Sequence, residues 1–206
     1  MSGETVTVYF DYLCPYAWHA AELAETVAEP LAVRFAWSHV SLYQLNHRGA
    51  DGWQLWNEPI DPHDEAGTRG LLPFLASLAA RRQGEAPHDA FRLALLRFRH
   101  RDLRPLHRAT VMEAAEEAQL HLACFERDLQ DPESRTELAR EHHQALATRV
   151  FGTPTFVLPS GDVAYVRLRG VPSEREAAVE LYRRVTGMLH DYPYLETVKR
   201  PRRRGN

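Results

Sequence analysis

The stretch DYLCPYAWHA, residues 11 to 20, decides how the N-terminal part of the chain is interpreted. It overlaps TVTVYFDY, residues 5 to 12, whose β-branched and aromatic residues predict a short buried strand. Pro15 suits the first position of a helix, where a missing N–H costs nothing, so Cys14 is predicted at the N-cap of a helix over YAWHAAELAETVAE. LAVRFAWSHV, residues 31 to 40, alternates large apolar residues with smaller or polar ones and predicts a second strand. These elements together predict a βαβ unit.

The middle of the chain has a different pattern. Residues 41 to 69 are rich in Gly, Asn, Pro and Asp and predict a long irregular passage, a feature that is often functional. From Gly70 to about Arg149 the apolar spacing is helical, and the last helix is predicted to have Asp131 as its N-cap and Pro132 in its first turn. The helical segments are LLPFLASLAARR, HDAFRLALLRFRH, HRATVMEAAEEAQ, LACFERDL and DPESRTELAREHHQALATR.

Strands return near the C-terminus. TFVLPS and VAYVRLRG predict two strands joined by a turn at residues 160–162. Ser173 and Glu176 have the spacing of a capping box and are predicted to begin a final helix that ends at about His190. Because strands enclose the helical block, the sequence predicts one α/β domain with an inserted all-helical subdomain. The predicted boundaries are 1–60 and 150–195 for the α/β domain, 61–149 for the insertion and 196–206 for a basic, disordered tail.

Composition excludes several classes of protein. The 206 residues are 44% hydrophobic and 26% charged, and the net charge of -3 gives no global reason to expect nucleic acid or an anionic membrane as partner. No apolar run is long enough to span a membrane, and MSGETVTVYF has no features of a secretory signal. We therefore expect a cytoplasmic protein with reduced cysteines. The eleven histidines lack ligand-like spacing, so no metal site is expected.

Two positions carry the chemistry. A thiol at a helix N-cap faces unpaired N–H groups and the positive end of the helix dipole, so the pKa of Cys14 is predicted to fall well below that of a free cysteine. The alternative is an inert buried cysteine, which is the commoner role of a free thiol. Thr153 and Pro154, in FGTPTFVLPSG, are predicted to lie in the turn directly before a strand.

Together these motifs resemble the thioredoxin-like superfamily, and within it the DsbA family in the branch of FrnE-type predicted dithiol-disulfide isomerases. WQLWNE, GLLPFLASLAARRQGE, FRLALLRFRH, FGTPTFVLPSG and PYLETVKRP are similar to that branch as well, so the resemblance covers nearly the whole chain. It implies a thioredoxin-like fold that performs thiol–disulfide exchange. Cys14 would be the attacking cysteine, Pro154 the adjacent cis-proline, and the backbone of Thr153 the partner of an extended substrate.

The family motif Cys-x-x-Cys is changed to Cys14-Pro15-Tyr16-Ala17 here. Cys14 could still form a mixed disulfide, but it has no neighbouring thiol that could release the substrate. The sequence therefore predicts an oxidoreductase or isomerase that uses one cysteine and an external thiol, such as glutathione or another small thiol. Cys124 is expected to be a packed structural thiol. The expected substrate is a disulfide-containing protein or a small thiol compound.

Two other functions are left open. The chain also resembles glutathione-dependent kappa-class transferases and 2-hydroxychromene-2-carboxylate isomerase, in which a serine stands where Cys14 does. A binding protein without catalysis is the third alternative. Tyr16 would control access to the thiol, and Trp18 either lines the pocket or packs in the core. Trp53 and Trp56 either line a substrate cleft or pack in the core, with packing favoured. His19 is expected at the surface. The oligomeric state is open, with a homodimer as one alternative.

Overall fold

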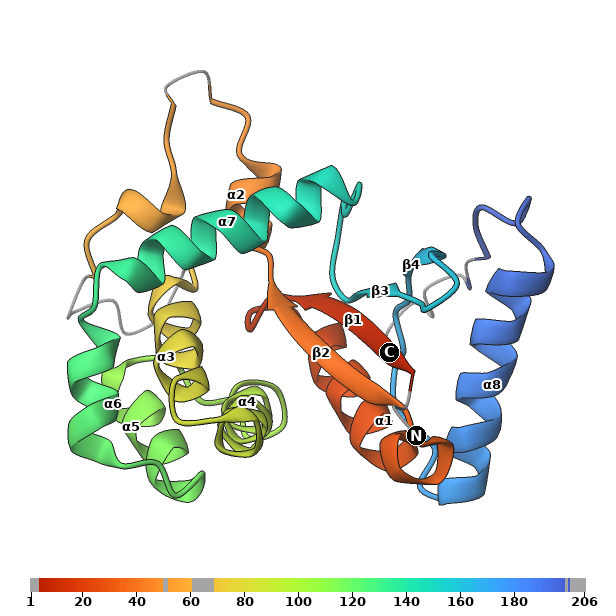
Figure 1. Ribbon diagram of the computed structural model, residues 1–206, viewed down its shortest axis with the longest axis horizontal. Helices are drawn as coiled ribbons and strands as arrows, with labels where there is room; N and C mark the ends of the chain where they lie inside the picture. Colours follow the sequence, from red (N-terminus) through yellow and green to blue (C-terminus); the bar gives the residue numbers. More distant parts are fainter. Residues whose placement is uncertain (1–3, 50–51, 61–68, 199, 201–206) are drawn as a thin grey trace, which may run out of the picture.

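The computed structural model of this chain describes residues 4–49, 52–60, 69–198 and 200. Its centre is a four-stranded sheet with the order β2-β1-β3-β4 (Figure 1). β1 and β2 are parallel, while β3 is antiparallel to β1 and to β4. The strands are β1 (Thr5–Phe10), β2 (Arg34–His39), β3 (Thr155–Val157) and β4 (Val163–Tyr165). The predicted α/β class is confirmed, although both C-terminal strands are shorter than predicted.

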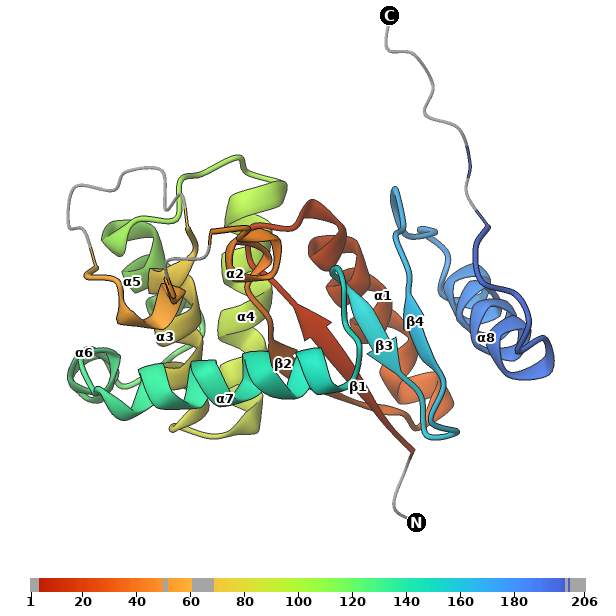
Figure 2. The same ribbon diagram turned by 90° about the horizontal axis from the view of Figure 1, so that it is seen from above.

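Two long helices cover one face of the sheet. α1 (Pro15–Leu31) connects the parallel strands, and α8 (Arg175–Asp191) lies beside it at the edge of the molecule (Figure 2). The predicted capping box of α8 is wrong, because the N-cap is Glu174 and no side chain caps the helix. The helix therefore starts one residue later than a box beginning at Ser173 requires. Its start follows the docking of α8 on α1, which outweighs the short local signal.

The passage after β2 contains short helices that the sequence did not predict. These are α2 (Leu42–Asn46) and the 3-10 helix η1 (Leu55–Asn57). Ser41 caps α2 by accepting a hydrogen bond from the Gln44 N–H, and the Gln44 side chain then bonds the backbone of Trp53 and Leu55. One glutamine thus joins both helices. Residues 50–51 and 61–68 of this passage lie outside the described residues.

The helical block follows the prediction closely. It lies on one side of the sheet, and α7 runs from the block across to the sheet (Figures 1 and 2). α7 begins one residue later than predicted, with Pro132 at the N-cap, but the Asp131 carboxylate still accepts the Glu133 N–H at 2.9 Å. The helices are α3 (Leu71–Arg81), α4 (Glu85–His100), α5 (Arg108–Glu117), α6 (Leu122–Leu129) and α7 (Glu133–Ala147).

One continuous core joins the sheet to the block. Residues that alternate along β1 and β2 point to the same face, where Phe35 packs against Tyr182 of α8 and Phe10 packs against Trp37. On the opposite face, Tyr9 belongs to a small cluster that also contains Val40, Ala145 and Val150, at the end of α7. Because strand side chains alternate between faces, the two faces of β1 are packed against different helices.

No helix in the described part of the chain combines the length and the hydropathy that crossing a membrane requires. Of the predicted basic tail, only residues 196–198 and 200 are described. The other tail residues therefore lie outside the structure.

Candidate functional site

Cys14 lies where β1 meets α1, as predicted. A tight turn ends in a hydrogen bond of 3.0 Å from the Cys14 N–H to the Asp11 carbonyl, and Pro15 then begins the helix. Cys14 is the N-cap residue, with extended backbone angles of φ -86 and ψ 115. The turn thus places the Cys14 sulfur at the N-terminal end of α1, next to the C-terminal end of β1.

The segment before β3 reaches the same place from the far end of the sequence. The Cys14 thiol donates a hydrogen bond of 3.2 Å to the Thr153 carbonyl oxygen. The Thr153–Pro154 peptide bond is cis. The Pro154 carbonyl accepts the Val166 N–H at 3.2 Å, which fixes the residues after β4 beside this segment. Cys14, Thr153 and Pro154, predicted as site residues from separate motifs, therefore meet at one point.

The predicted acidic thiol is wrong. Cys14 is only 4% exposed, and burial raises its pKa above the ordinary value because a charged sulfur loses hydration there. The side-chain hydroxyl of Thr153 and the N–H groups of Ala17 and Tyr16 favour the thiolate and act in the opposite direction, as expected at a helix start, but their effect is smaller. The N-cap position was predicted correctly, whereas the burial that decides the sign of the shift depends on the tertiary structure.

Asp11 is a buried carboxyl group in this turn. Its two oxygens accept the N–H groups of Leu13 at 2.8 Å and Leu42 at 2.7 Å. Burial raises the Asp11 pKa to about 6, and these two bonds only partly offset that effect. The ionised carboxylate in turn raises the pKa of Cys14. Sequence reasoning missed Asp11, although an acidic residue at the end of an apolar strand, three positions before the cysteine, was a usable signal.

A rim of aromatic and cationic side chains borders the site. The Arg167 guanidinium carbon lies 4.9 Å from the centre of the Tyr16 ring and 5.4 Å from that of Tyr165. Tyr165 is 36% exposed and packs edge-on against Phe151, with ring centres 5.2 Å apart. Of these residues only Tyr16 was predicted. The others occupy ordinary strand and loop positions whose convergence near Cys14 is a tertiary feature.

The remaining predicted site residues lie in packed positions. Ala17 is fully buried, and Trp18 is partly buried against the main core. Trp56 is buried against His142 of α7, which agrees with the packing alternative. The Trp53 indole donates a hydrogen bond to Glu58.

Two further predictions concern a thiol and a histidine. Cys124 is a free, half-buried thiol in α6, so it is less packed than expected. His19 is half-buried and pairs with Glu22 at 3.0 Å.

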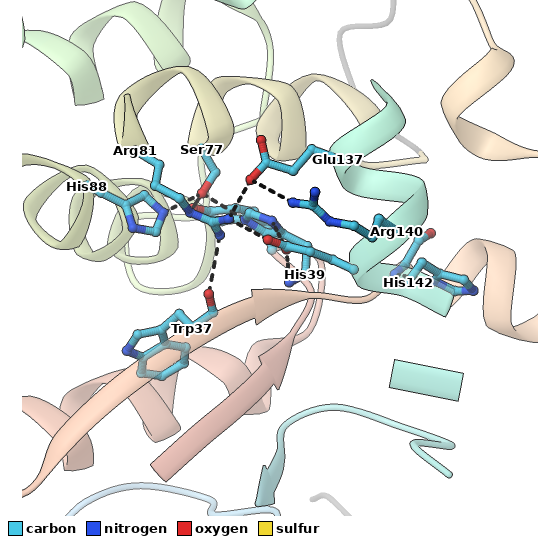
Figure 3. A network of polar contacts seen from close by, with 11 residues as sticks. Trp37, His39, Ser77, Arg81, His88, Glu137, Arg140 and His142 are labelled. Atoms are coloured by element: carbon cyan, nitrogen blue, oxygen red, sulfur yellow. Dashed lines mark hydrogen bonds and ion pairs between the residues drawn. The ribbon is translucent and has the colours of Figure 1, made fainter. Parts of the chain in front are cut away.

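A second polar cluster lies between β2 and the helical block (Figure 3). Ser77 of α3 is within 2.9 Å of the ring nitrogens of His39 and His88, and it accepts the Tyr12 hydroxyl at 2.8 Å. Glu141 lies 2.7 Å from the other nitrogen of His39. Glu141, His39 and Ser77 are arranged in the order of a catalytic triad, but the serine is fully buried, so no substrate can reach it. We interpret this cluster as structural.

Glu141 of this cluster contacts both the His39 ring and the Arg81 guanidinium. Burial raises its pKa, but His39 and Arg81 outweigh burial and hold the pKa of Glu141 well below its usual range. Arg81 pairs with both Glu141 and Glu137. Within the described residues, no three His, Cys, Asp or Glu side chains are placed to hold a metal ion.

The contact between the helical block and the Cys14 turn is direct. The ring of His100 at the end of α4 lies 2.8 Å from the Tyr12 carbonyl, and burial lowers the His100 pKa to about 4. The neutral ring therefore donates its Nε2–H to the carbonyl, which can only accept. Gly70, at the start of α3 with φ 73, would bring a Cβ within 3.2 Å of the Leu13 side chain. A glycine here permits the positive φ and the close approach.

Comparison with known proteins gives the same architecture. A thioredoxin-like oxidoreductase from Silicibacter pomeroyi DSS-3 is 25% identical, with 89% of this chain and 88% of that chain covered and a TM-score of 0.52. The cytosolic disulfide reductase DsbM from Pseudomonas aeruginosa, solved with GSH, is 18% identical, with 91% and 99% covered and a TM-score of 0.58. A 2-hydroxychromene-2-carboxylate isomerase is 14% identical, with 94% and 100% covered and a TM-score of 0.61.

The model of the DSBA-like thioredoxin domain matches residues 5–178, a range that contains the sheet, the helical block and both segments of the site. With most of its length matched and the site assembled from both ends of that range, the chain belongs to the DSBA-like thioredoxin domain family.

Proposed function

We propose that this chain catalyses thiol–disulfide exchange through the single sulfur of Cys14. The observation that carries the proposal is the contact of 3.2 Å between that sulfur and the Thr153 carbonyl, beside Pro154. It places the thiol next to the backbone segment that the family resemblance assigns to substrate binding. Ala17 supplies no second thiol in the motif, and Cys124 lies in α6 of the helical block.

The reaction proceeds in two balanced exchanges. Cys14 loses its proton to solvent, and its sulfur forms a bond to one sulfur of the substrate disulfide while the other sulfur leaves as a thiolate. An external thiolate, for which we propose glutathione or another small thiol, then attacks the substrate sulfur and releases Cys14 as a thiolate. One disulfide and one thiol are consumed, and one disulfide and one thiol are formed. Because burial raises the Cys14 pKa, the exchange is expected to accelerate as the pH rises from 7 to 9.

The test is the mass of the intact protein after exposure to glutathione disulfide at pH 8. We expect one glutathione per chain in the wild type and in Cys124→Ser, no adduct in Cys14→Ser, and loss of the adduct when reduced glutathione is added. An adduct that persists in Cys14→Ser, or a wild-type protein that no disulfide modifies, would contradict the proposal. In the second case the fold would serve as a binding module.

A second candidate is a glutathione-dependent transferase or isomerase. The observation that favours it is the protonated, buried thiol of Cys14, which could donate a hydrogen bond to the sulfur of bound glutathione as a serine hydroxyl would. Reduced glutathione would then bind without forming an adduct, and an electrophilic aromatic compound would be turned over. Calorimetric titration with reduced glutathione, together with the mass measurement, separates the two candidates.

A further inference from the structure

The Arg167 guanidinium is held beside the proposed site without a carboxylate partner. Among the described residues, no Asp or Glu oxygen lies within ion-pair distance of it, although many other arginines have such pairs. Its position is instead determined by the rings of Tyr16 and Tyr165, over which it lies. An exposed guanidinium that is not paired with a carboxylate can bind an anion through its N–H donors.

The supporting backbone holds this cation next to the Thr153–Pro154 segment that contacts Cys14. The N–H of Val166 bonds the carbonyl of Pro154, so the extended chain carries Tyr165 and Arg167 on the same side. The Tyr165 ring lies across Gly152, where an added Cβ would come within 3.1 Å of it. Tyr16 belongs to the same helix start as Cys14. The guanidinium is thus fixed from both halves of the site.

The surroundings suit a planar anion that is attached to a small apolar group. Phe151 is 72% exposed and, with Tyr165, provides apolar contact next to the cation. Burial raises the pKa of the Tyr165 phenol, which therefore stays protonated and can donate a second hydrogen bond to an anion held by Arg167. A carboxylate accepts a planar, two-point contact of this kind.

We propose that Arg167, supported by Tyr16 and Tyr165, forms a subsite for a carboxylate group of the disulfide that reacts at Cys14. This inference rests on the proposed function and specifies its substrate class, a small disulfide that carries a carboxylate near its sulfur atoms. Arg167 binds the substrate and takes no part in the exchange of bonds.

The test compares three small disulfides of similar size, namely 3,3'-dithiodipropionate (anionic), bis(2-hydroxyethyl) disulfide (neutral) and cystamine (cationic). The rate at which each forms a mixed disulfide with Cys14 is followed by mass. The wild type should react fastest with the dicarboxylate. Arg167→Gln should lower that rate about five- to ten-fold and leave the neutral disulfide nearly unchanged, and Arg167→Glu should favour cystamine. Arg183→Gln is the matched control, since Arg183 is an exposed arginine on α8, and it should change none of the three rates by more than about two-fold.

A second measurement does not depend on disulfide exchange. Iodoacetate and iodoacetamide both alkylate Cys14, but only iodoacetate carries a carboxylate. The rate with iodoacetate divided by the rate with iodoacetamide should therefore fall in Arg167→Gln but not in Arg183→Gln. An unchanged ratio, or an equal loss in both variants, would overturn the subsite. If alkylation depends on Arg167 but no disulfide modifies Cys14, the subsite stands and the proposed exchange function fails.

Discussion

The sulfur of Cys14 lies at the start of α1, where backbone N–H groups favour the thiolate, and also in a buried position, where lost hydration favours the thiol. The second effect is larger, so the resting residue is a thiol that donates to Thr153. Two neighbouring groups shift this balance in opposite directions and can be changed one at a time.

The Thr153 hydroxyl is buried without a hydrogen-bond partner while Cys14 is a thiol, and it lowers the thiol pKa because it can donate a hydrogen bond to the charged sulfur. Thr153→Val keeps the shape and removes the hydroxyl. We expect a higher Cys14 pKa and slower alkylation at pH 8. The free energy of unfolding should be unchanged or slightly increased, because an unpaired buried hydroxyl is removed. Titration of the thiolate absorbance in a Cys124→Ser background measures the pKa, and a fall in pKa would contradict the assignment.

Asp11 raises the Cys14 pKa by its negative charge and is itself ionised above a pKa of about 6. Asp11→Asn should therefore lower the pKa of Cys14 and speed its alkylation at pH 8 severalfold. The variant should also lose about 1–2 kcal/mol of stability, because Leu13 and Leu42 each donate to a different carboxylate oxygen and the NH2 group that replaces one oxygen cannot accept. Alkylation rates against pH, with urea unfolding of the same variant, measure both effects. Slower alkylation would show that hydrogen bonding outweighs charge here.

At the scale of elements, one serine joins two helices of the block to the sheet. Ser77 of α3 contacts His88 of α4, His39 of β2 and Tyr12, which lies in the Cys14 turn two residues after the end of β1. A hydroxyl donates once and accepts twice, so these three partners use its full capacity, with one imidazole donating and the other accepting. Strands and helices that are distant in sequence therefore share one hydrogen-bond centre.

Ser77→Ala removes the partner of all three buried groups at once. We expect a loss of about 3 kcal/mol or more in the free energy of unfolding, since each unsatisfied buried group costs about 1–3 kcal/mol. Ser160→Ala is the control, because that serine is exposed in the turn between β3 and β4 and should change stability by less than about 0.5 kcal/mol. Urea unfolding of both variants measures the difference. Equal effects would mean that the buried cluster contributes little.

At the scale of the whole molecule, several buried histidines must stay neutral for the block to pack. Burial lowers the pKa of His88 to about 2 and those of His100 and His142 to about 4. Below the ordinary histidine pKa of about 6.5 the unfolded chain binds protons that the folded protein does not, so stability falls as the pH falls. Asp11 acts in the opposite direction, because its raised pKa lets the folded protein bind a proton first.

These shifts predict that stability falls on acidification from pH 7 to 5.5. Together the three histidines contribute a loss of about 4 kcal/mol and Asp11 offsets about 1 kcal/mol, so the net loss is about 3 kcal/mol. Urea unfolding at both pH values measures it. His88→Gln should reduce the difference between the two pH values by about 1 kcal/mol, because the residue whose pKa burial lowers no longer titrates. A stability that is constant or rises at pH 5.5 would contradict this account.

The sequence alone predicted the elements and their order, because strands and helices are encoded by local periodicity and by Pro15 and Gly70 at element starts. It missed α2 and η1, whose short helices depend on bonds between residues that are adjacent only after folding, such as Gln44 to Leu55. It also predicted a capping box at Ser173 that docking of α8 overrides. Local signals are reliable where they agree with packing and are lost where packing opposes them.

The site shows the same division. From the sequence alone came Cys14 at a helix start, Pro154 before a strand, and the missing second cysteine of the motif. Only the tertiary structure decided that the Cys14 and Pro154 segments meet and that burial keeps the sulfur protonated. It also decided that Arg167 lies over Tyr16 at the edge of the site. The reason is physical. A residue's place in an element depends on its near neighbours in sequence, whereas its hydration and its charged neighbours depend on chain segments that only folding brings together.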